Sequence, residues 1–314
     1  MKKLLKSLGL IYLIGINILA QSCKDESDTT DFPLSAVIFN SVKDKQVAFT
    51  ALTHSATNWH WDFGDGQTST EQNPVHVYAE SGYYMATLTA SDKNGNTASD
   101  DVNLAIAITP YVLLTGGATA TNGKTWKLAT SHGAGKDYFA DANADLTTTD
   151  GTPNPLPDGI FGQLGMPDVY PDEYTFYYDG SYKHDVKSDG AAFGGLVYQY
   201  VLNGAADVIN VNGEDYGLCI ANYTPEADAT FTYTASEDLT IASVYGENGQ
   251  VTYKNVSTLD FSGTEFIGFR DYQRKVIIKK ITDTSMQLVL FMAASPGYFP
   301  ANTNALILSF EVVQ

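Results

Sequence analysis

The sequence predicts an all-β protein made of two β-sandwiches, a small one over residues 34–108 and a larger, jelly-roll-like one over residues 109–314. Apolar and polar residues alternate in short runs such as QVAFTAL (46–52), and this period of two favours strands. Asn94-Gly95 and Asp179-Gly180 separate such runs and indicate hairpin turns. No stretch of useful length carries the period of an amphipathic helix, so the whole chain is expected to be β-structure.

Residues 1–22 have the composition of a secretory leader. A basic start, MKKLLK, precedes the apolar run LGLIYLIGINILA, which is too short for a comfortable membrane span. The following LAQSC resembles a bacterial lipobox, so Cys23 is expected to become the lipidated first residue of the mature protein. Ordinary cleavage beside a free cysteine is the alternative. The second cysteine, Cys219, is expected to be a small buried apolar residue.

Residues 23–33 are predicted to be a lipidated, acidic tether. An acidic stretch directly after a lipidated cysteine resembles the export signal of Bacteroidota surface lipoproteins. This resemblance implies an outer-membrane protein that is held by lipid and faces the cell exterior. Removing residues 1–22, with their three lysines, takes the formal net charge from −18 to −21. Such a charge opposes binding to nucleic acid.

The first predicted sandwich contains a recognisable series of short motifs. In chain order they are WDFGDG (61–66), PVHVY (74–78), GYY (82–84) and TLT (87–89). This series resembles the polycystic-kidney-disease (PKD) domain, which is immunoglobulin-like. The resemblance implies that Trp61 and Phe63 are core residues and that Asp62 and Asp65 shape a turn. The domain is therefore predicted to be a spacer that folds alone and binds no glycan, and not to use its two acids in catalysis.

Strand-like runs recur through residues 109–314, about nine in all, which suggests a jelly-roll or related double sheet. In the run DEYTFYYD (172–179), Tyr174, Phe176 and Tyr178 share one face. These rings are expected to pack in the core or against a neighbouring strand rather than to bind sugar.

A second resemblance covers most of residues 113–314. It rests on the motifs LLTGG (113–117), GKTWKL (123–128), SHGAG (131–135), YPDEYTF (170–176) and DFSGTEFIGF (260–269). They are similar to a carbohydrate-binding-type domain of surface glycan-binding lipoproteins in Bacteroidota polysaccharide-utilisation systems. The resemblance implies a sandwich that captures polysaccharide, with β-1,3-glucans among the ligand classes, and passes it to an outer-membrane importer complex. Relatives carry tryptophan in the loop that corresponds to residues 136–170, and this chain has none there.

Aromatic residues on loops are the predicted glycan-binding groups, because no strand explains them. Tyr138, Phe139 and Phe161 lie in the loop 136–170, and Tyr298 lies in SPGYFPANTN. The alternative is that these rings pin their loops onto the sandwich. Asp137 and Gln163 are the predicted polar contacts to sugar hydroxyls.

A laminarin-type β-glucan is the predicted ligand, because residues 137–170 contain no Lys or Arg that could hold a polyuronate. The alternative is an acidic polysaccharide such as alginate or pectin, held by a patch of Arg270, Arg274 and Lys275. A surface adhesion or display protein is the third hypothesis, since an anchor, a spacer and a sandwich suit it equally.

Motifs of enzymes are absent from the sequence: no H-E-x-x-H, G-x-S-x-G or P-loop pattern occurs, and the five histidines lack ligand-like spacing. We therefore expect no enzyme, although a pair of glycosidase carboxylates leaves no sequence signature. No cofactor is expected apart from a possible Ca²⁺. Its candidate ligands, in DANADLTTTD, are Asp141, Asn143, Asp145 and Asp150. The run lacks the Gly and Glu of an EF-hand, so a solvated polar loop is the alternative.

Overall fold

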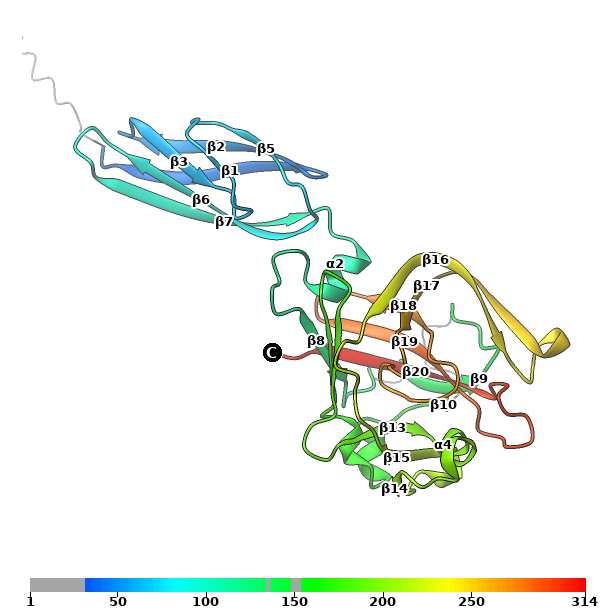
Figure 1. The fold of residues 1–314 in the computed structure, drawn as a ribbon. Helices are drawn as coiled ribbons and strands as arrows, with labels where there is room; N and C mark the ends of the chain where they lie inside the picture. Colours follow the sequence, from blue (N-terminus) through cyan, green and yellow to red (C-terminus); the bar gives the residue numbers. More distant parts are fainter. Residues whose placement is uncertain (1–31, 134–135, 148–153) are drawn as a thin grey trace, which may run out of the picture.

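The computed structural model describes residues 32–133, 136–147 and 154–314, and it confirms the all-β class. Strands account for 48% of the described residues and helices for 10%. The first sandwich lies at one end of the molecule and the larger one at the other (Figure 1). In the described residues no helix is both long enough and apolar enough to cross a membrane.

The first sandwich consists of two antiparallel sheets, with strand orders β1-β2-β5 and β4-β3-β6-β7. Alternation along β2 sends Val47, Phe49 and Ala51 inward, as the pattern predicts. The β6–β7 hairpin turns through Asn94-Gly95, and Gly95 has a φ of 83°. In chain order the strands are β1 (Ser35–Lys43), β2 (Gln46–His54), β3 (Asn58–Asp62), β4 (Thr68–Ser69), β5 (Val75–Val77), β6 (Gly82–Ser91) and β7 (Thr97–Ile106).

Trp61 and Phe63 are core residues of this sandwich, as predicted. Trp61 is fully buried, packs against Phe49 at 5.1 Å between ring centroids, and donates its indole N–H to the Glu71 carbonyl at 3.0 Å. Asp62 and Asp65 form the predicted turn, because each accepts a hydrogen bond from a backbone N–H two residues further on. Asp65 also contacts the His76 Nε2 at 2.7 Å. These acids therefore have structural partners.

The larger domain is built on one curled sheet of ten strands with the order β12-β11-β8-β20-β19-β18-β17-β16, to which β9 and β10 attach beside β20. A second, three-stranded sheet has the order β13-β15-β14 and lies below the large sheet in Figure 1. The strands are β8 (Lys124–Leu128), β9 (Tyr138–Asp141), β10 (Asn154–Pro155), β11 (Glu173–Phe176), β12 (Tyr182–Asp185), β13 (Ala191–Gly195), β14 (Val208–Asn210), β15 (Leu218–Asn222), β16 (Phe231–Ala242), β17 (Gln250–Phe261), β18 (Val276–Ile281), β19 (Ser285–Met292) and β20 (Asn304–Val312).

The large sheet buries both of its faces over part of its area. Along β19, Met286, Leu288 and Leu290 enter the main core, which the small sheet covers, while Val289 and Phe291 enter a second core on the opposite face. Tyr174 and Phe176 lie in the main core, as the sequence predicts for the aromatic run. Cys219 is also buried, and burial raises the pKa of its thiol to about 12.

Several short helices were not expected from the sequence. The longest, α4, has eight residues, LVYQYVLN, whose β-branched and aromatic side chains are typical of strands. Gly195 precedes the helix, and Gly204 ends it with a φ of 68°. These end residues favour a helix here despite the strand propensity of the side chains between them. The helices are α2 (Pro110–Thr115), α3 (Ile160–Gln163) and α4 (Leu196–Asn203), with 3₁₀ turns η1 (Pro167–Val169), η2 (Glu214–Tyr216) and η3 (Glu247–Gly249).

The two domains meet at α2 and the start of β6. Gly82 forms an isolated antiparallel bridge with Gly117, and a Cβ on Gly117 would lie 2.9 Å from the Gly82 Cα. Tyr83 donates a hydrogen bond to Asp283, and Thr119 donates to the Tyr83 carbonyl at 2.7 Å. Backbone pairing and side-chain bonds therefore join the sandwiches at one edge.

We expect Trp61→Ala to lower the free energy of unfolding of the first sandwich by about 3–5 kcal/mol, because it empties the largest site in the core. Trp59→Ala is the matched control. Trp59 is only half-buried, so its loss should cost roughly 1 kcal/mol. Urea unfolding of residues 34–108, followed by circular dichroism, measures both. Equal transition midpoints for the two variants would show that Trp61 stabilises this core no more than Trp59 does.

Candidate functional site

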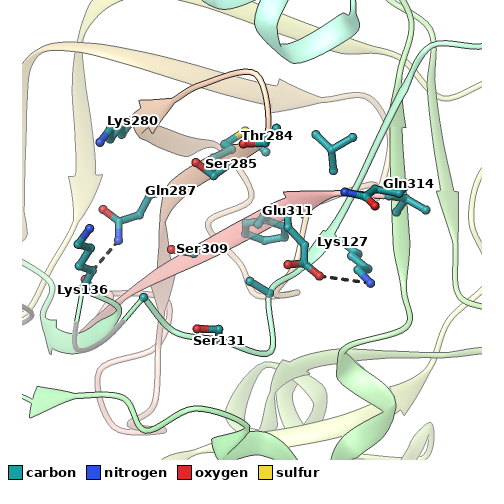
Figure 2. Close-up of a pocket in the computed structure, with 16 residues that line it drawn as sticks. Lys127, Ser131, Lys136, Lys280, Thr284, Ser285, Gln287, Ser309, Glu311 and Gln314 are labelled. Carbon is teal, nitrogen blue, oxygen red and sulfur yellow. Dashed lines mark hydrogen bonds and ion pairs between the residues drawn. The ribbon is translucent and has the colours of Figure 1, made fainter.

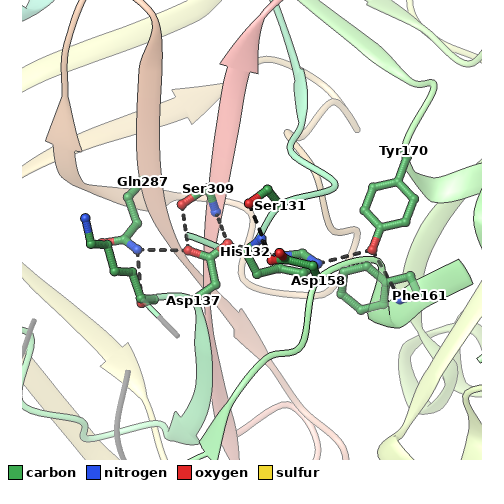
Figure 3. Close-up of polar contacts among 9 residues, drawn as sticks. Ser131, His132, Asp137, Asp158, Phe161, Tyr170, Gln287 and Ser309 are labelled. Atoms are coloured by element: carbon green, nitrogen blue, oxygen red, sulfur yellow. Dashed lines mark hydrogen bonds and ion pairs between the residues drawn. The ribbon is translucent and has the colours of Figure 1, made fainter. Parts of the chain in front are cut away.

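The loop that precedes β11 is fixed to the large sheet by a buried polar network around Asp137 (Figure 3). The Asp137 carboxylate accepts hydrogen bonds from the Ser309 N–H at 2.7 Å, the Ser309 hydroxyl at 2.6 Å and the Gln287 amide at 2.9 Å. His132 Nδ1 lies 3.1 Å from the same carboxylate, and His132 Nε2 lies 3.1 Å from the Tyr170 hydroxyl. Two strands and both ends of the loop therefore meet at one buried carboxylate.

Asp137 is not placed to contact a glycan, which corrects the sequence-based prediction. Its side chain is fully buried, and its two oxygens already face four donor groups inside the protein. A carboxylate is held in such a position because several N–H and O–H groups replace its lost water. Its role here is to position its neighbours.

Two of the predicted stacking rings are also buried, so they offer no face to a sugar. Tyr138 is 1% exposed and lies in the second core, with the Lys279 ammonium 5.2 Å from its ring centroid. Phe161 is 0% exposed and packs on Phe193 at 4.8 Å and edge-on to His132 at 5.6 Å. For these two rings the structure supports the alternative reading, in which aromatic residues pin the loop to the sandwich.

Phe139 is half-buried and lines an open cleft of about 780 Å³, which we call the aromatic cleft. Pro155 and Leu156 continue its wall on the loop side. The cleft is also lined by Glu214, Asp215 and Tyr216 of η2, by Leu196 and Val197 of α4, and by Asn304 of β20. The predicted loop thus contributes to a concave site. Of the residues predicted to bind glycan, Phe139 lines the cleft with a half-buried ring, and the buried Phe161 borders it as well.

Tyr216 is the exposed ring of the aromatic cleft, with 55% of its surface accessible. It ends a single 3₁₀ turn that Gly217 terminates with a φ of 74°, a conformation that suits glycine. Gly213 precedes the turn, where a Cβ would lie 2.8 Å from the Leu218 Cβ and 2.9 Å from the Met166 sulfur. The glycines hold a tight turn against the core, so Glu214, Asp215 and Tyr216 project from it.

Tyr216 is not among the residues predicted from the sequence, although a signal for it was present. GEDYG (213–217) places an aromatic ring and two acids between glycines, outside any strand-like run. This is the same criterion that selected the rings of the loop 136–170.

The two remaining predicted groups are not among the residues that line the aromatic cleft. Gln163 is exposed and donates its amide to the Asp158 carbonyl at 2.9 Å. Tyr298 is 65% exposed on a separate loop, next to Phe299, whose ring packs edge-on against Tyr272. A glycan contact by Gln163 or Tyr298 stays a prediction.

The structure describes three of the four predicted calcium ligands. Asp145 accepts bonds from the Thr147 N–H and hydroxyl at 2.9 and 2.7 Å, as in a local polar turn. Asp141 is at the end of β9, Asn143 is exposed, and Asp150 lies outside the described residues. Among the side chains that are described, no group of three or more His, Cys, Asp or Glu is arranged to hold a metal ion. Calcium binding stays a prediction.

The basic patch suggested for an acidic polysaccharide is not assembled. Arg274 donates to the Gly263 carbonyl, Lys275 pairs with Glu237 at 2.7 Å, and Arg270 stacks on Tyr223 with 4.6 Å to the ring centroid. Each cation therefore has its own partner within the domain.

Cations gather instead in a groove of about 800 Å³ on the large sheet, which we call the lysine groove (Figure 2). Its charged lining residues are Lys127, Lys136, Lys280 and Glu311, and its polar ones include Gln287. The Asp137 network connects this groove with the loop that forms the aromatic cleft, because Gln287 lines the groove and also bonds to Asp137.

Comparison with known proteins identifies the first sandwich: residues 40–106 match the PKD domain. The chain is similar to collagenase ColA of Bacillus cereus, 31% identical over 78 residues that cover 25% of this chain and 8% of that one. It is also similar to a microbial collagenase of Vibrio alginolyticus, 49% identical over 39 residues that cover 12% and 5%. The chain spans less than a tenth of either protein, and these matches lie in the PKD domain.

The chain is also similar to two solved structures. The PKD1 domain of the Vibrio cholerae metalloprotease PrtV is 27% identical over 24% of this chain and all of its own, with a TM-score of 0.24. A structure described as "Structural basis for the promiscuous specificity of the carbohydrate-binding modules from the beta-sandwich super family" covers 90% of this chain and 93% of its own. Its identity is 11% and its TM-score is 0.25. The protein is therefore an all-β chain with a PKD domain in front of a curled β-sandwich.

We expect Asp137→Asn to lower the free energy of unfolding of the larger domain by about 3 kcal/mol. The new amide N–H₂ replaces one of the two carboxylate oxygens. At Oδ1 it would face the Gln287 amide and the Ser309 hydroxyl, and at Oδ2 the Ser309 N–H and His132, instead of accepting from them. Asp158→Asn is the control, because this exposed acid accepts chiefly one backbone bond, from His132, and its replacement should cost about 1 kcal/mol or less. Urea unfolding measures the free energy of unfolding of both variants. Similar losses in the two would mean that the buried Asp137 carboxylate stabilises the domain no more than the exposed Asp158 does.

Proposed function

We propose that the protein is a non-catalytic, cell-surface glycan-binding lipoprotein that captures polysaccharide in the aromatic cleft. The observation that supports this proposal is an exposed tyrosine beside two carboxylates and an amide in an open cleft of about 780 Å³. Ring faces stack on the apolar faces of pyranose units, and carboxylate and amide groups fix hydroxyls. Clefts of this size suit ligands of a few sugar units.

A neutral glycan of the laminarin β-glucan type is the proposed ligand. Glu214 and Asp215 line the aromatic cleft, and no Lys or Arg does so among the residues that the structure describes. Two carboxylates without a cation repel a polyuronate and leave a neutral sugar as the better ligand.

The remaining parts of the proposal follow from the N-terminal sequence. Cys23 would carry lipid that holds the protein on the outer face of the outer membrane, and the PKD domain would act as a spacer. The larger domain would then present captured glycan to an outer-membrane importer complex. Cys23 and the tether up to residue 31 lie outside the described residues. Adhesion to a protein partner is the alternative, and an absence of glycan binding would favour it.

We expect the soluble chain without residues 1–23 to bind laminarin, and Tyr216→Ala to weaken that binding about tenfold. Tyr200→Ala is the matched control, because Tyr200 is equally exposed, at 60%, but does not line the aromatic cleft. Isothermal titration calorimetry measures all three proteins. Equal affinities for the two variants would argue against the cleft, and new reducing ends on prolonged incubation would contradict the non-catalytic assignment.

We expect Cys23→Ala to move the protein from the membrane fraction to the soluble fraction, because it removes the only proposed anchor. Cys219→Ala is the control, since this buried cysteine has no access to a lipid-transfer enzyme and its loss should leave the protein in membranes. Cell fractionation with immunodetection reports both. A Cys23→Ala protein that stays with the membrane would refute lipid anchoring.

A further inference from the structure

The lysine groove is the uncovered half of a sheet face whose other half is core. On this face β19 presents Gln287 and then Val289, and β20 presents Ser309 and then Ile307. Val289 and Ile307 are fully buried in the second core, whereas Gln287 and Ser309 line the groove. An apolar sheet face must be covered by other elements to keep it from water. On this face the side chains become polar at the point where the covering elements end.

The charges of the groove are arranged in two rows across the strands. Lys280 of β18 pairs in register with Gln287, and Gln287 pairs with Ser309. In the next row Glu311 stands opposite Lys127 on β8, and their charged groups are 3.3 Å apart. The positive charge of Lys127 is therefore compensated locally.

Lys136 and Lys280 have no acidic partner among the described residues. Figure 2 shows both on the side of the groove where Gln287 lies, away from the pair of Lys127 and Glu311. In a chain with a formal net charge of −18, two unpaired ammonium groups in one groove form a local site of opposite sign.

Gln287 is held rigidly between these cations. Its amide N–H₂ donates to the Asp137 carboxylate at 2.9 Å and to the Lys136 carbonyl at 3.2 Å. The amide oxygen then has no donor among the residues that the structure describes, and it remains available to accept a hydrogen bond from a hydroxyl group. The buried network thus pre-positions a hydroxyl acceptor beside two cations.

We propose that the lysine groove is a second glycan site that binds the acidic groups of a polysaccharide, the carboxylate of a uronate or a sulfate ester. Lys136 and Lys280 would hold the acidic group, and Gln287 would accept from a neighbouring sugar hydroxyl. Strands lie about 4.8 Å apart, so the row from Lys280 to Ser309 spans roughly 10 Å, which suits an extended chain better than a single ion. The site goes beyond the neutral-glycan function proposed above and does not depend on it.

The charge of the whole molecule limits the choice of polyanion. A formal net charge of −18 repels nucleic acid, whose binding requires many phosphate contacts. A ligand with acidic groups spaced along a chain of hydroxyl-bearing units matches two cations and one amide acceptor better.

The test is a titration of the soluble chain without residues 1–23 with polygalacturonate and with a sulfated glucan, at low and at high salt. We expect binding of at least one of them that weakens as salt rises, because the charges are exposed. The double variant Lys136→Gln with Lys280→Gln should bind the acidic polysaccharide about tenfold more weakly or worse, because the loss of each exposed charge lowers the affinity several-fold. Lys254→Gln is the matched control, because Lys254 is an exposed lysine outside the groove that pairs with Asp238 at 2.7 Å.

Each outcome bears on the proposal. Binding of polygalacturonate alone identifies carboxylate as the natural group, and binding of the sulfated glucan alone identifies sulfate. Failure of both to bind, or an equal loss in Lys254→Gln, overturns it. Poly-L-glutamate that binds as tightly as the acidic glycans, and loses affinity in the same double variant, also overturns it, because no sugar would then be recognised. Laminarin affinity should be unchanged in the double variant, so failure here is distinct from failure of the aromatic cleft.

Discussion

The Asp137 carboxylate is the constraint on which the aromatic cleft and the lysine groove of the larger domain depend. A buried ionised group is tolerated only when donors surround it, and here they come from a loop residue, from β19 and from β20. Because these donors belong to segments far apart in the chain, satisfying one carboxylate fixes the loop against the sheet. Phe139 then lies on the wall of the aromatic cleft, and Gln287 is held in the lysine groove.

The larger domain carries two concave surfaces of different character, the aromatic cleft and the lysine groove. The main core is continuous across the strands of the large sheet, so Leu288, Leu308 and Phe310 are fixed by packing alone. The opposite face is apolar only where β9 and the arms of β16 and β17 cover it. The uncovered part of this face does not have to be apolar, and it carries the lysines of the lysine groove. The aromatic cleft is a separate surface, to which the loop and η2 contribute. The two surfaces differ in charge, because Glu214 and Asp215 line the aromatic cleft while Lys136 and Lys280 line the lysine groove.

The PKD domain uses its characteristic residues for folding. Its turn acids have hydrogen-bond partners and its tryptophan Trp61 is buried, so the residues that make the motif recognisable are explained by folding. The bridge of Gly82 and Gly117, with the bond from Tyr83 to Asp283, joins it directly to the larger domain. These contacts favour a fixed angle between the two domains rather than a flexible connection.

The sequence by itself determined the β class, the PKD domain, the hairpins at Asn94-Gly95 and Asp179-Gly180 and the packing of the rings of β11, because alternation and turn chemistry are local properties. It also indicated the loop 136–170 as part of a site. Only the tertiary structure decided which side chains face solvent. Tyr138 and Phe161 are buried in the cores, and Asp137 is buried among hydrogen-bond donors, whereas Tyr216 is exposed. Residues far apart in the chain, such as Lys136, Lys280 and Gln287, meet only when the strands pair. Exposure and convergence depend on long-range packing, which no local pattern encodes.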